Sequence, residues 1–208
     1  MEFARTTQRR LQMIDIESLK EIVKQSKEEG KIVFLNNTFQ DTPNWETFYD
    51  IFKIALGRQA ADLSAPSTLT IDNSEGYTDN FDSIVSTLEN LHPGDKIAVL
   101  SIIHFMNSHN NDVPDAAQAF YRDFIEANPN KLPPGFDYSL FQPTIHSDPV
   151  DGFYIQCEGQ TTWRAFYKDR TESYLVNPGD LLYIPKGIDH SVESMNVRAA
   201  ISVSFFDE

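Results

Sequence analysis

The last third of the chain decides the fold, since residues 141–206 read FQPTIHSDPVDGFYIQCEGQTTWRAFYKDRTESYLVNPGDLLYIPKGIDHSVESMNVRAAISVSFF. Short apolar and β-branched runs alternate in this stretch with turns that contain Gly, Pro or Asp. The runs fall at 153–157, 161–167, 173–176, 181–184, 190–193 and 199–206. Short strands at such spacing are typical of antiparallel sandwiches and barrels. The stretch therefore predicts a compact jelly-roll barrel.

The chain before this stretch combines helical segments with a few strands. Apolar residues recur at helical spacing in four segments, 6–30, 43–56, 81–91 and 116–127. Apolar runs predict strands at 31–35, 69–71 and 96–105. We expect one domain over 1–208, with 1–135 as a helical and supporting segment and 136–208 as the barrel core. The predicted class is mostly β with N-terminal helices, a double-stranded β-helix of the cupin kind.

Composition excludes several classes of protein. Hydrophobic residues make up 40% and charged residues 23% of the chain, which is ordinary globular usage. No apolar run approaches the roughly 20 residues that cross a bilayer, and the polar start MEFAR lacks the apolar core of a secretory signal. We therefore expect a cytoplasmic, soluble chain with no membrane partner. The single cysteine, Cys157, excludes an internal disulfide and a cysteine-built metal site.

The net charge of −14 argues against nucleic acid as a partner. Proteins that bind nucleic acid non-specifically draw their affinity from Lys and Arg contacts with phosphates. The acidic residues are spread along the chain, which is typical of a solvated surface. The apolar faces of the N-terminal helices could pair two copies into a homo-oligomer, and the sequence leaves the oligomeric state open.

Three residues form a candidate metal site. Asp148 follows His146 by two positions, so both side chains can point to the same side of an extended strand. His190 lies 42 residues beyond Asp148 and follows the turn 185–187, so it could arrive from a neighbouring strand. Two histidines and one carboxylate form the facial triad of non-heme iron(II) oxygenases, which leaves coordination positions open. The spacing alone is as consistent with ordinary surface or core histidines as it is with a metal site.

The surrounding sequence resembles the JmjC-like and cupin-like hydroxylases. The likeness rests on residues 141–159, 161–166 and 176–194, and it includes the asparaginyl hydroxylase of hypoxia-inducible factor and the ribosomal-protein oxygenases. In that pattern a His-x-Asp precedes a strand with Gln, then Gly and Trp, then Pro-Gly-Asp-x-Leu-Tyr-Ile-Pro and a distal His. The resemblance implies a double-stranded β-helix, metal binding by His146, Asp148 and His190, and 2-oxoglutarate as the co-substrate.

The residues for the co-substrate depart from the family pattern. Thr161 stands where the family has a Lys or Arg that pairs with the distal carboxylate of 2-oxoglutarate, and Gly152 stands where it often has Asn. Arg198 and Ser204 lie six positions apart on the last predicted strand, so both side chains could face the inside of the barrel. Tyr154 lies an even number of positions from His146 and Asp148, so its side chain could line the same pocket. We expect Arg198 to bind the distal carboxylate, with Thr161 assisting.

Three functions follow as alternatives. The first is an iron(II)- and 2-oxoglutarate-dependent oxygenase that hydroxylates a protein side chain or a small molecule. The second is a non-catalytic cupin that binds a metal or ligand, and the third is a cupin oxygenase that does not use 2-oxoglutarate. Trp163 is predicted to pack in the core, and Cys157 to be a buried small apolar residue.

Overall fold

The computed structural model describes residues 16–58, 61–65, 68–72, 96–104, 145–195 and 197–206. It contains two helices in these ranges, α1 (Ile16–Glu29) and α2 (Trp45–Arg58). The upstream strands are β1 (Val33–Leu35), β2 (Ala61–Ala65), β3 (Thr68–Asp72) and β4 (Lys96–His104). The downstream strands are β5 (Asp151–Glu158), β6 (Thr161–Phe166), β7 (Thr171–Val176), β8 (Leu181–Ile184), β9 (Asp189–Ser194) and β10 (Arg198–Phe206). The helices predicted at 81–91 and 116–127 lie outside the described residues.

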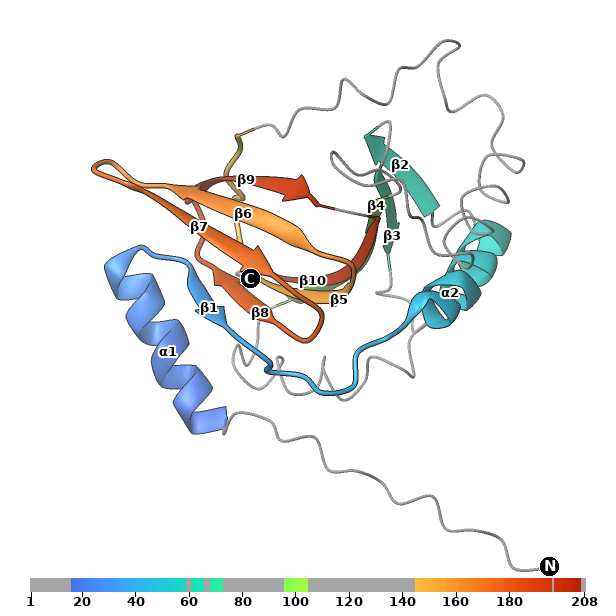
Figure 1. The fold of residues 1–208 in the computed structure, drawn as a ribbon, viewed down its shortest axis with the longest axis horizontal. Helices are drawn as coiled ribbons and strands as arrows, with labels where there is room; N and C mark the ends of the chain where they lie inside the picture. The colour runs from blue at the N-terminus through green and yellow to red at the C-terminus, as the bar shows by residue number, and fades with distance from the viewer. Residues whose placement is uncertain are drawn as a thin grey trace, which may run out of the picture.

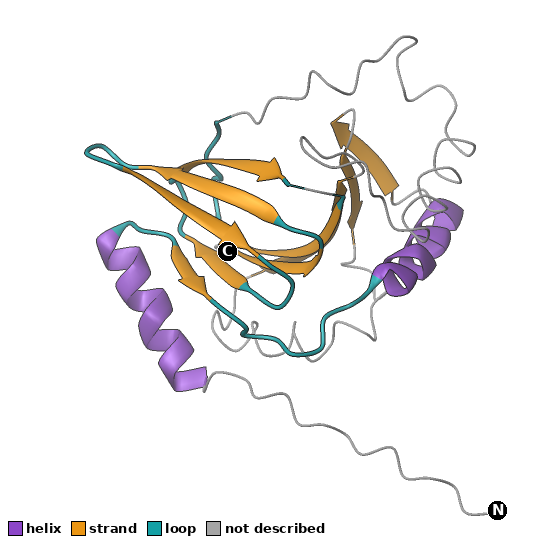
Figure 2. Ribbon diagram, in the orientation of Figure 1, coloured by secondary structure: helices purple, strands orange, loops and turns teal. Residues whose placement is uncertain are grey.

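The strands form two antiparallel sheets. The larger sheet has the order β1-β8-β5-β10-β4-β3-β2, and the smaller sheet has the order β7-β6-β9. The smaller sheet lies across the larger one, and both helices lie outside the strands (Figures 1 and 2). This is the jelly-roll architecture that the sequence predicts, and the predicted fold class is confirmed. Neither described helix is long and apolar enough to cross a bilayer.

Strands from the upstream part of the chain complete the larger sheet. β4 pairs with β10 along its whole length, from Arg198 opposite His104 to Phe206 opposite Lys96. β1 pairs with β8, and β3 pairs with β4. The strand predicted at 96–105 is therefore an interior strand of the sheet. It pairs with the edge of β10 opposite to the one that pairs with β5.

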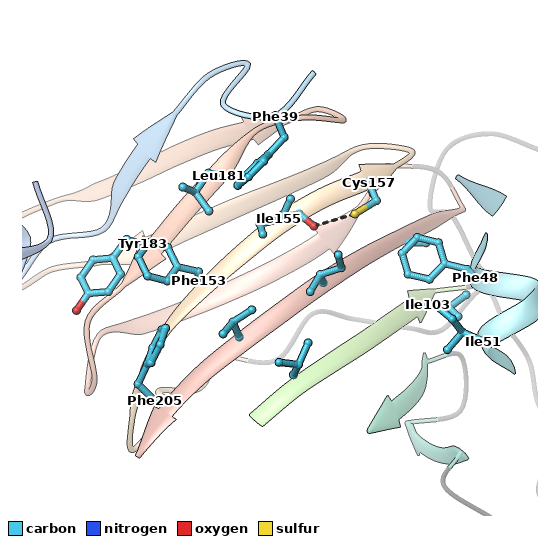
Figure 3. Close-up of a cluster of buried hydrophobic side chains, with 14 of the residues drawn as sticks. Phe39, Phe48, Ile51, Ile103, Phe153, Ile155, Cys157, Leu181, Tyr183 and Phe205 are labelled. Carbon is cyan, nitrogen blue, oxygen red and sulfur yellow. Dashed lines mark hydrogen bonds between the residues drawn. The ribbon is translucent and has the colours of Figure 1, made fainter. Parts of the chain in front are cut away.

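The two faces of the larger sheet carry different clusters of apolar side chains. On the outer face, Phe153, Ile155 and Cys157 of β5 belong to a buried cluster that also contains Phe48 and Ile51 of α2 (Figure 3). The inner face packs against the smaller sheet, and the cluster between them consists of Ile32, Tyr154, Trp163, Ala165, Val176, Leu182, Ile184 and Ala200. The alternation along β5 therefore sends Tyr154 to the inner face and its neighbours to the outer one.

The turn Pro178-Gly179-Asp180, which precedes β8, is held by hydrogen bonds to other parts of the sheet. Gly179 adopts a φ of +91°, and its amide donates a hydrogen bond of 2.9 Å to the carbonyl of Gln156. The Asp180 carboxylate accepts bonds of 2.8 Å from the amides of Asn37 and Asn177. The turn thus joins β5, β8 and the segment after β1.

Gly179→Ala is expected to lower the free energy of unfolding by about 2–5 kcal/mol, combining the left-handed backbone with overpacking. A Cβ at this position would lie 2.4 Å from the carbonyl oxygen of Phe39. Gly187→Ala is the matched control, because Gly187 also has a positive φ (+79°) but its Cβ would meet nothing within 4 Å. Its cost should stay at about 1–2 kcal/mol. Denaturant unfolding measures both variants, and equal losses would contradict the steric argument.

Candidate metal centre

The two strand segments that carry the triad are joined through their main chains. The amide of His146 donates to the carbonyl of His190 at 2.9 Å, and the amide of His190 donates to the carbonyl of His146 at 2.7 Å. His146 thereby forms an antiparallel bridge with β9, although it lies before β5 in the chain. This bridge fixes the two histidines side by side, with ring centroids 4.4 Å apart.

A second set of bonds holds Asp148 beside the same strand. Its carbonyl accepts a bond of 2.8 Å from the amide of Gly187, in the turn just before β9. The amide of Lys186 donates to the Asp151 carboxylate at 2.8 Å, and that carboxylate also forms an ion pair of 2.6 Å with Lys27 of α1. The segment that carries His146 and Asp148 is therefore attached to the turn that leads into His190.

The ligand atoms of His146, Asp148 and His190 all lie within 4.8 Å of one another. The Nε2 atom of His190 is 3.8 Å from Oδ2 of Asp148. Atoms that bind one ion at about 2.1 Å, along perpendicular directions, lie about 3 Å apart. Side-chain movements of about 1 Å would bring these ligand atoms to the spacing that one ion requires. His146 and Asp148 are exposed and can make such movements, so the three residues fit a metal ion.

The surroundings of His190 suit a metal ligand. The Nδ1–H group is placed to donate to the carbonyl of Ile188 at 2.9 Å, which leaves Nε2 as the lone-pair nitrogen on the Asp148 side. A hydrogen bond of this kind fixes the tautomer of a metal-binding histidine. Burial lowers the pKa of the His190 imidazole, and the neighbouring His146 lowers it further. Both effects favour the neutral ring, which is the form that binds metals.

Four polar side chains form a buried cluster inside the barrel, which we call the anion cluster: Tyr154, Gln156, Thr161 and Arg198. Arg198 donates from Nη1 to the hydroxyl of Tyr154. Tyr154 in turn donates to Oε1 of Gln156 at 2.7 Å, and Thr161 donates to the same oxygen at 3.0 Å. Burial raises the pKa of Tyr154, so its hydroxyl keeps the proton that it donates. The cluster is a hydrogen-bonded network in which Oε1 of Gln156 accepts from two hydroxyls and Arg198 is the one cation.

Strand register brings this cluster together. Ala200 of β10 lies opposite Gln156 of β5, and Ser202 lies opposite Tyr154. A register shift between Ala199 and Ala200 gives β5 one extra residue at that point. Arg198, at the start of β10, is 5% exposed and its guanidinium carbon lies 5.7 Å from the centre of the Tyr154 ring.

The other predicted residues occupy different places. Ser204 is half-buried opposite Gly152, six positions along β10 from Arg198, and its role stays a prediction. Arg164 points to the outer side of β6, where it forms an ion pair of 3.0 Å with Glu193. Cys157 is buried, as expected, and burial raises the pKa of its thiol.

Trp163 has a position that its sequence context did not indicate. It is buried as predicted, but its ring stacks on His190, with centroids 5.0 Å apart and an interplanar angle of 23°. Its other neighbour is the ring of Tyr154, at 4.8 Å. Gln156, beside Tyr154 on the inner side of β5, accepts bonds from both Tyr154 and Thr161. The alternation of β5 and β6 places these residues inside the barrel, but their mutual contacts depend on long-range register.

Among the comparisons with known proteins, the solved structures support the fold. No family model matches the chain. Ribosomal oxygenase 2 of Rattus norvegicus is 35% identical over 66 residues, which cover 24% of this chain and 14% of that protein. The solved structure of YcfD, a ribosomal oxygenase from Escherichia coli in complex with cobalt and succinic acid, matches with a TM-score of 0.57 and 16% identity over 86% of this chain and 48% of that chain. YcfD in complex with cobalt and 2-oxoglutarate matches with a TM-score of 0.56 and 15% identity over the same shares.

These matches define the structural class. The chain has the double-stranded β-helix fold seen in ribosomal oxygenase structures, and the resemblance found in its sequence is confirmed for the fold. The chain spans about half the length of the YcfD structures and 14% of the curated relative.

Proposed function

We propose that this chain is an iron(II)- and 2-oxoglutarate-dependent oxygenase. The observation that carries the proposal is the convergence of His146, Asp148 and His190 within 4.8 Å. Two histidines and one carboxylate are the ligand set of non-heme iron oxygenases with open coordination positions. The fold supports the same reading, because structures with this fold include an oxygenase in complex with cobalt and 2-oxoglutarate.

The residues of the site would have separate roles in binding the metal and the substrate. His146, Asp148 and His190 would hold iron(II), with the Ile188 carbonyl fixing the orientation of the His190 ring. When bound with 2-oxoglutarate and O₂, iron supplies the oxidative decarboxylation that yields succinate and the hydroxylation of a substrate C–H bond. The protein supplies binding, orientation and exclusion of side reactions. His146 and Asp148 are exposed, so a substrate could reach a metal held by them from solvent.

The anion cluster would bind the distal carboxylate of 2-oxoglutarate. The guanidinium of Arg198 is buried and donates to the hydroxyl of Tyr154, so it brings a positive charge inside the barrel. A carboxylate complements this charge, and Arg can bind both of its oxygens through its planar fork. Thr161, at the position where the resembling family has a basic residue, supplies a neutral hydroxyl beside it. Arg198 therefore replaces the missing Lys from a different strand.

The names of the relatives favour a ribosomal component as the substrate. Both the curated relative and the matching solved structures are called ribosomal oxygenases. We propose a protein side chain of the ribosome as the first substrate class to test, ahead of a free small molecule.

Anaerobic reconstitution tests the function directly. Iron(II) is added to the protein without O₂, and 2-oxoglutarate is then titrated while the visible spectrum is recorded. We expect a weak metal-to-ligand band that saturates with 2-oxoglutarate, and succinate after O₂ is admitted. Iron binding without the band would instead favour a cupin that binds a metal but not this co-substrate. The band without succinate would contradict catalysis.

A further inference from the structure

One buried donor is not accounted for by the metal triad or by the anion cluster. It is the indole Nε1 of Trp163, which has no hydrogen-bond partner among the described residues. The side chain of Trp163 is 5% exposed. A buried indole N–H usually has a partner, because leaving it unbonded sacrifices the hydrogen bond that it makes with water in the unfolded chain. A partner is therefore expected at this position.

The place of Trp163 indicates what this partner is. Its ring stacks on the metal ligand His190 at 5.0 Å and contacts the ring of Tyr154 at 4.8 Å. Tyr154 accepts the hydrogen bond from Arg198. Trp163 thus contacts one residue of the metal triad and one residue of the anion cluster. A dicarboxylate that binds both groups would lie near its indole ring.

We propose that the indole N–H of Trp163 donates a hydrogen bond to an oxygen of the bound 2-oxo dicarboxylate. The inference rests on the proposed function, and it adds a binding residue on β6 to the set that the sequence indicates. Trp163 then has two roles in one side chain. Its face packs on His190 and orients that ligand, while its edge contacts the co-substrate.

Two measurements test the inference on the full-length protein loaded with zinc(II), which is diamagnetic and does not turn over. The first is the indole N–H resonance in a ¹⁵N-labelled sample during a titration with 2-oxoglutarate. The chain has only two tryptophans, and the resonance that is lost in Trp163→Phe identifies Trp163. We expect the Trp163 proton to move downfield while the Trp45 resonance stays in place, because Trp45 belongs to the outer cluster.

The second measurement is the affinity for 2-oxoglutarate by calorimetry. Trp163→Phe keeps an aromatic ring against His190 and removes the N–H, so we expect about tenfold weaker binding of 2-oxoglutarate, the loss expected for a bond to a charged acceptor. Zinc affinity should fall much less than the affinity for 2-oxoglutarate, because Phe keeps an aromatic ring against His190. Trp45→Phe serves as the control and should leave both affinities unchanged.

The outcomes separate the inference from the proposed function. If the wild-type protein binds 2-oxoglutarate but the Trp163 resonance does not move, the inference is overturned, even where Trp163→Phe binds more weakly through altered packing. Equal affinities in wild type and Trp163→Phe overturn it as well. If zinc-loaded wild type binds no 2-oxoglutarate at all, the proposed co-substrate fails, and the inference fails with it.

Discussion

His146→Ala and Asp148→Ala are each expected to abolish stoichiometric iron(II) binding, with affinity falling by more than about 100-fold, beyond the loss that follows from disturbing a supporting residue. Each variant removes one of the ligands whose atoms converge within 4.8 Å. The fold should survive, because both side chains are exposed and the bonds that hold their segment come from the main chain. Anaerobic iron titration measures the affinity, and thermal unfolding of the metal-free proteins measures the fold.

Ser147→Ala is the matched control for the metal ligands. Ser147 lies between His146 and Asp148, is exposed like them, and is not among the converging ligands. It should keep wild-type iron affinity and the same melting temperature. Wild-type affinity in both His146→Ala and Asp148→Ala would show that the metal triad is assigned wrongly.

Arg198→Ala is expected to weaken 2-oxoglutarate binding by about 30-fold or more, since truncating one partner of a buried charge pair costs about 2–5 kcal/mol. Thr161→Ala removes a neutral donor and should weaken it by less than about tenfold. The affinities are measured by titrating 2-oxoglutarate into the metal-loaded variants. Iron affinity should remain close to that of wild type in both, because neither residue belongs to the metal triad.

Two further variants separate the charge of Arg198 from its packing. Arg198→Met keeps a long apolar stem inside the barrel but removes the charge, and it should bind 2-oxoglutarate as weakly as Arg198→Ala. Arg164→Ala removes an arginine whose ion pair with Glu193 lies on the outer side of β6, and it should bind 2-oxoglutarate as wild type does. Wild-type affinity in Arg198→Met would remove Arg198 from the co-substrate site.

The sequence predicted the barrel because its strands are short and their turns are marked. Gly179 has a positive φ and lies in the turn before β8, in a Pro-Gly-Asp motif that can be recognised in the sequence. The two-residue spacing of His146 and Asp148 indicated a shared side, and the structure brings their ligand atoms near His190. Alternation on the last strand also pointed Arg198 inward, where the structure places it against Tyr154. These features depend on local spacing, which a sequence carries directly.

Other features depend on contacts between distant residues. The amide of Asn37 binds the carboxylate of Asp180, 143 positions away, and no local pattern marks that pair. The register shift at Ala199 and Ala200 sets which β5 residue faces each β10 residue. Trp163 matched an ordinary core position in the sequence, because its stack on His190 arises only when β6 pairs with β9. A strand pattern gives the face of a residue but not its neighbour across the sheet.

The bridge between His146 and His190 has a consequence for redesign of the pocket. Its two hydrogen bonds join peptide groups, so the spacing of the two histidines is inherited from strand pairing and not from the residues that line the barrel. Lining positions such as Thr161 and Tyr154 can therefore be varied as a library while the backbone of the metal ligands keeps its register. Such a library would test whether the proposed co-substrate can be exchanged for another acid while the spacing of the two histidines is kept.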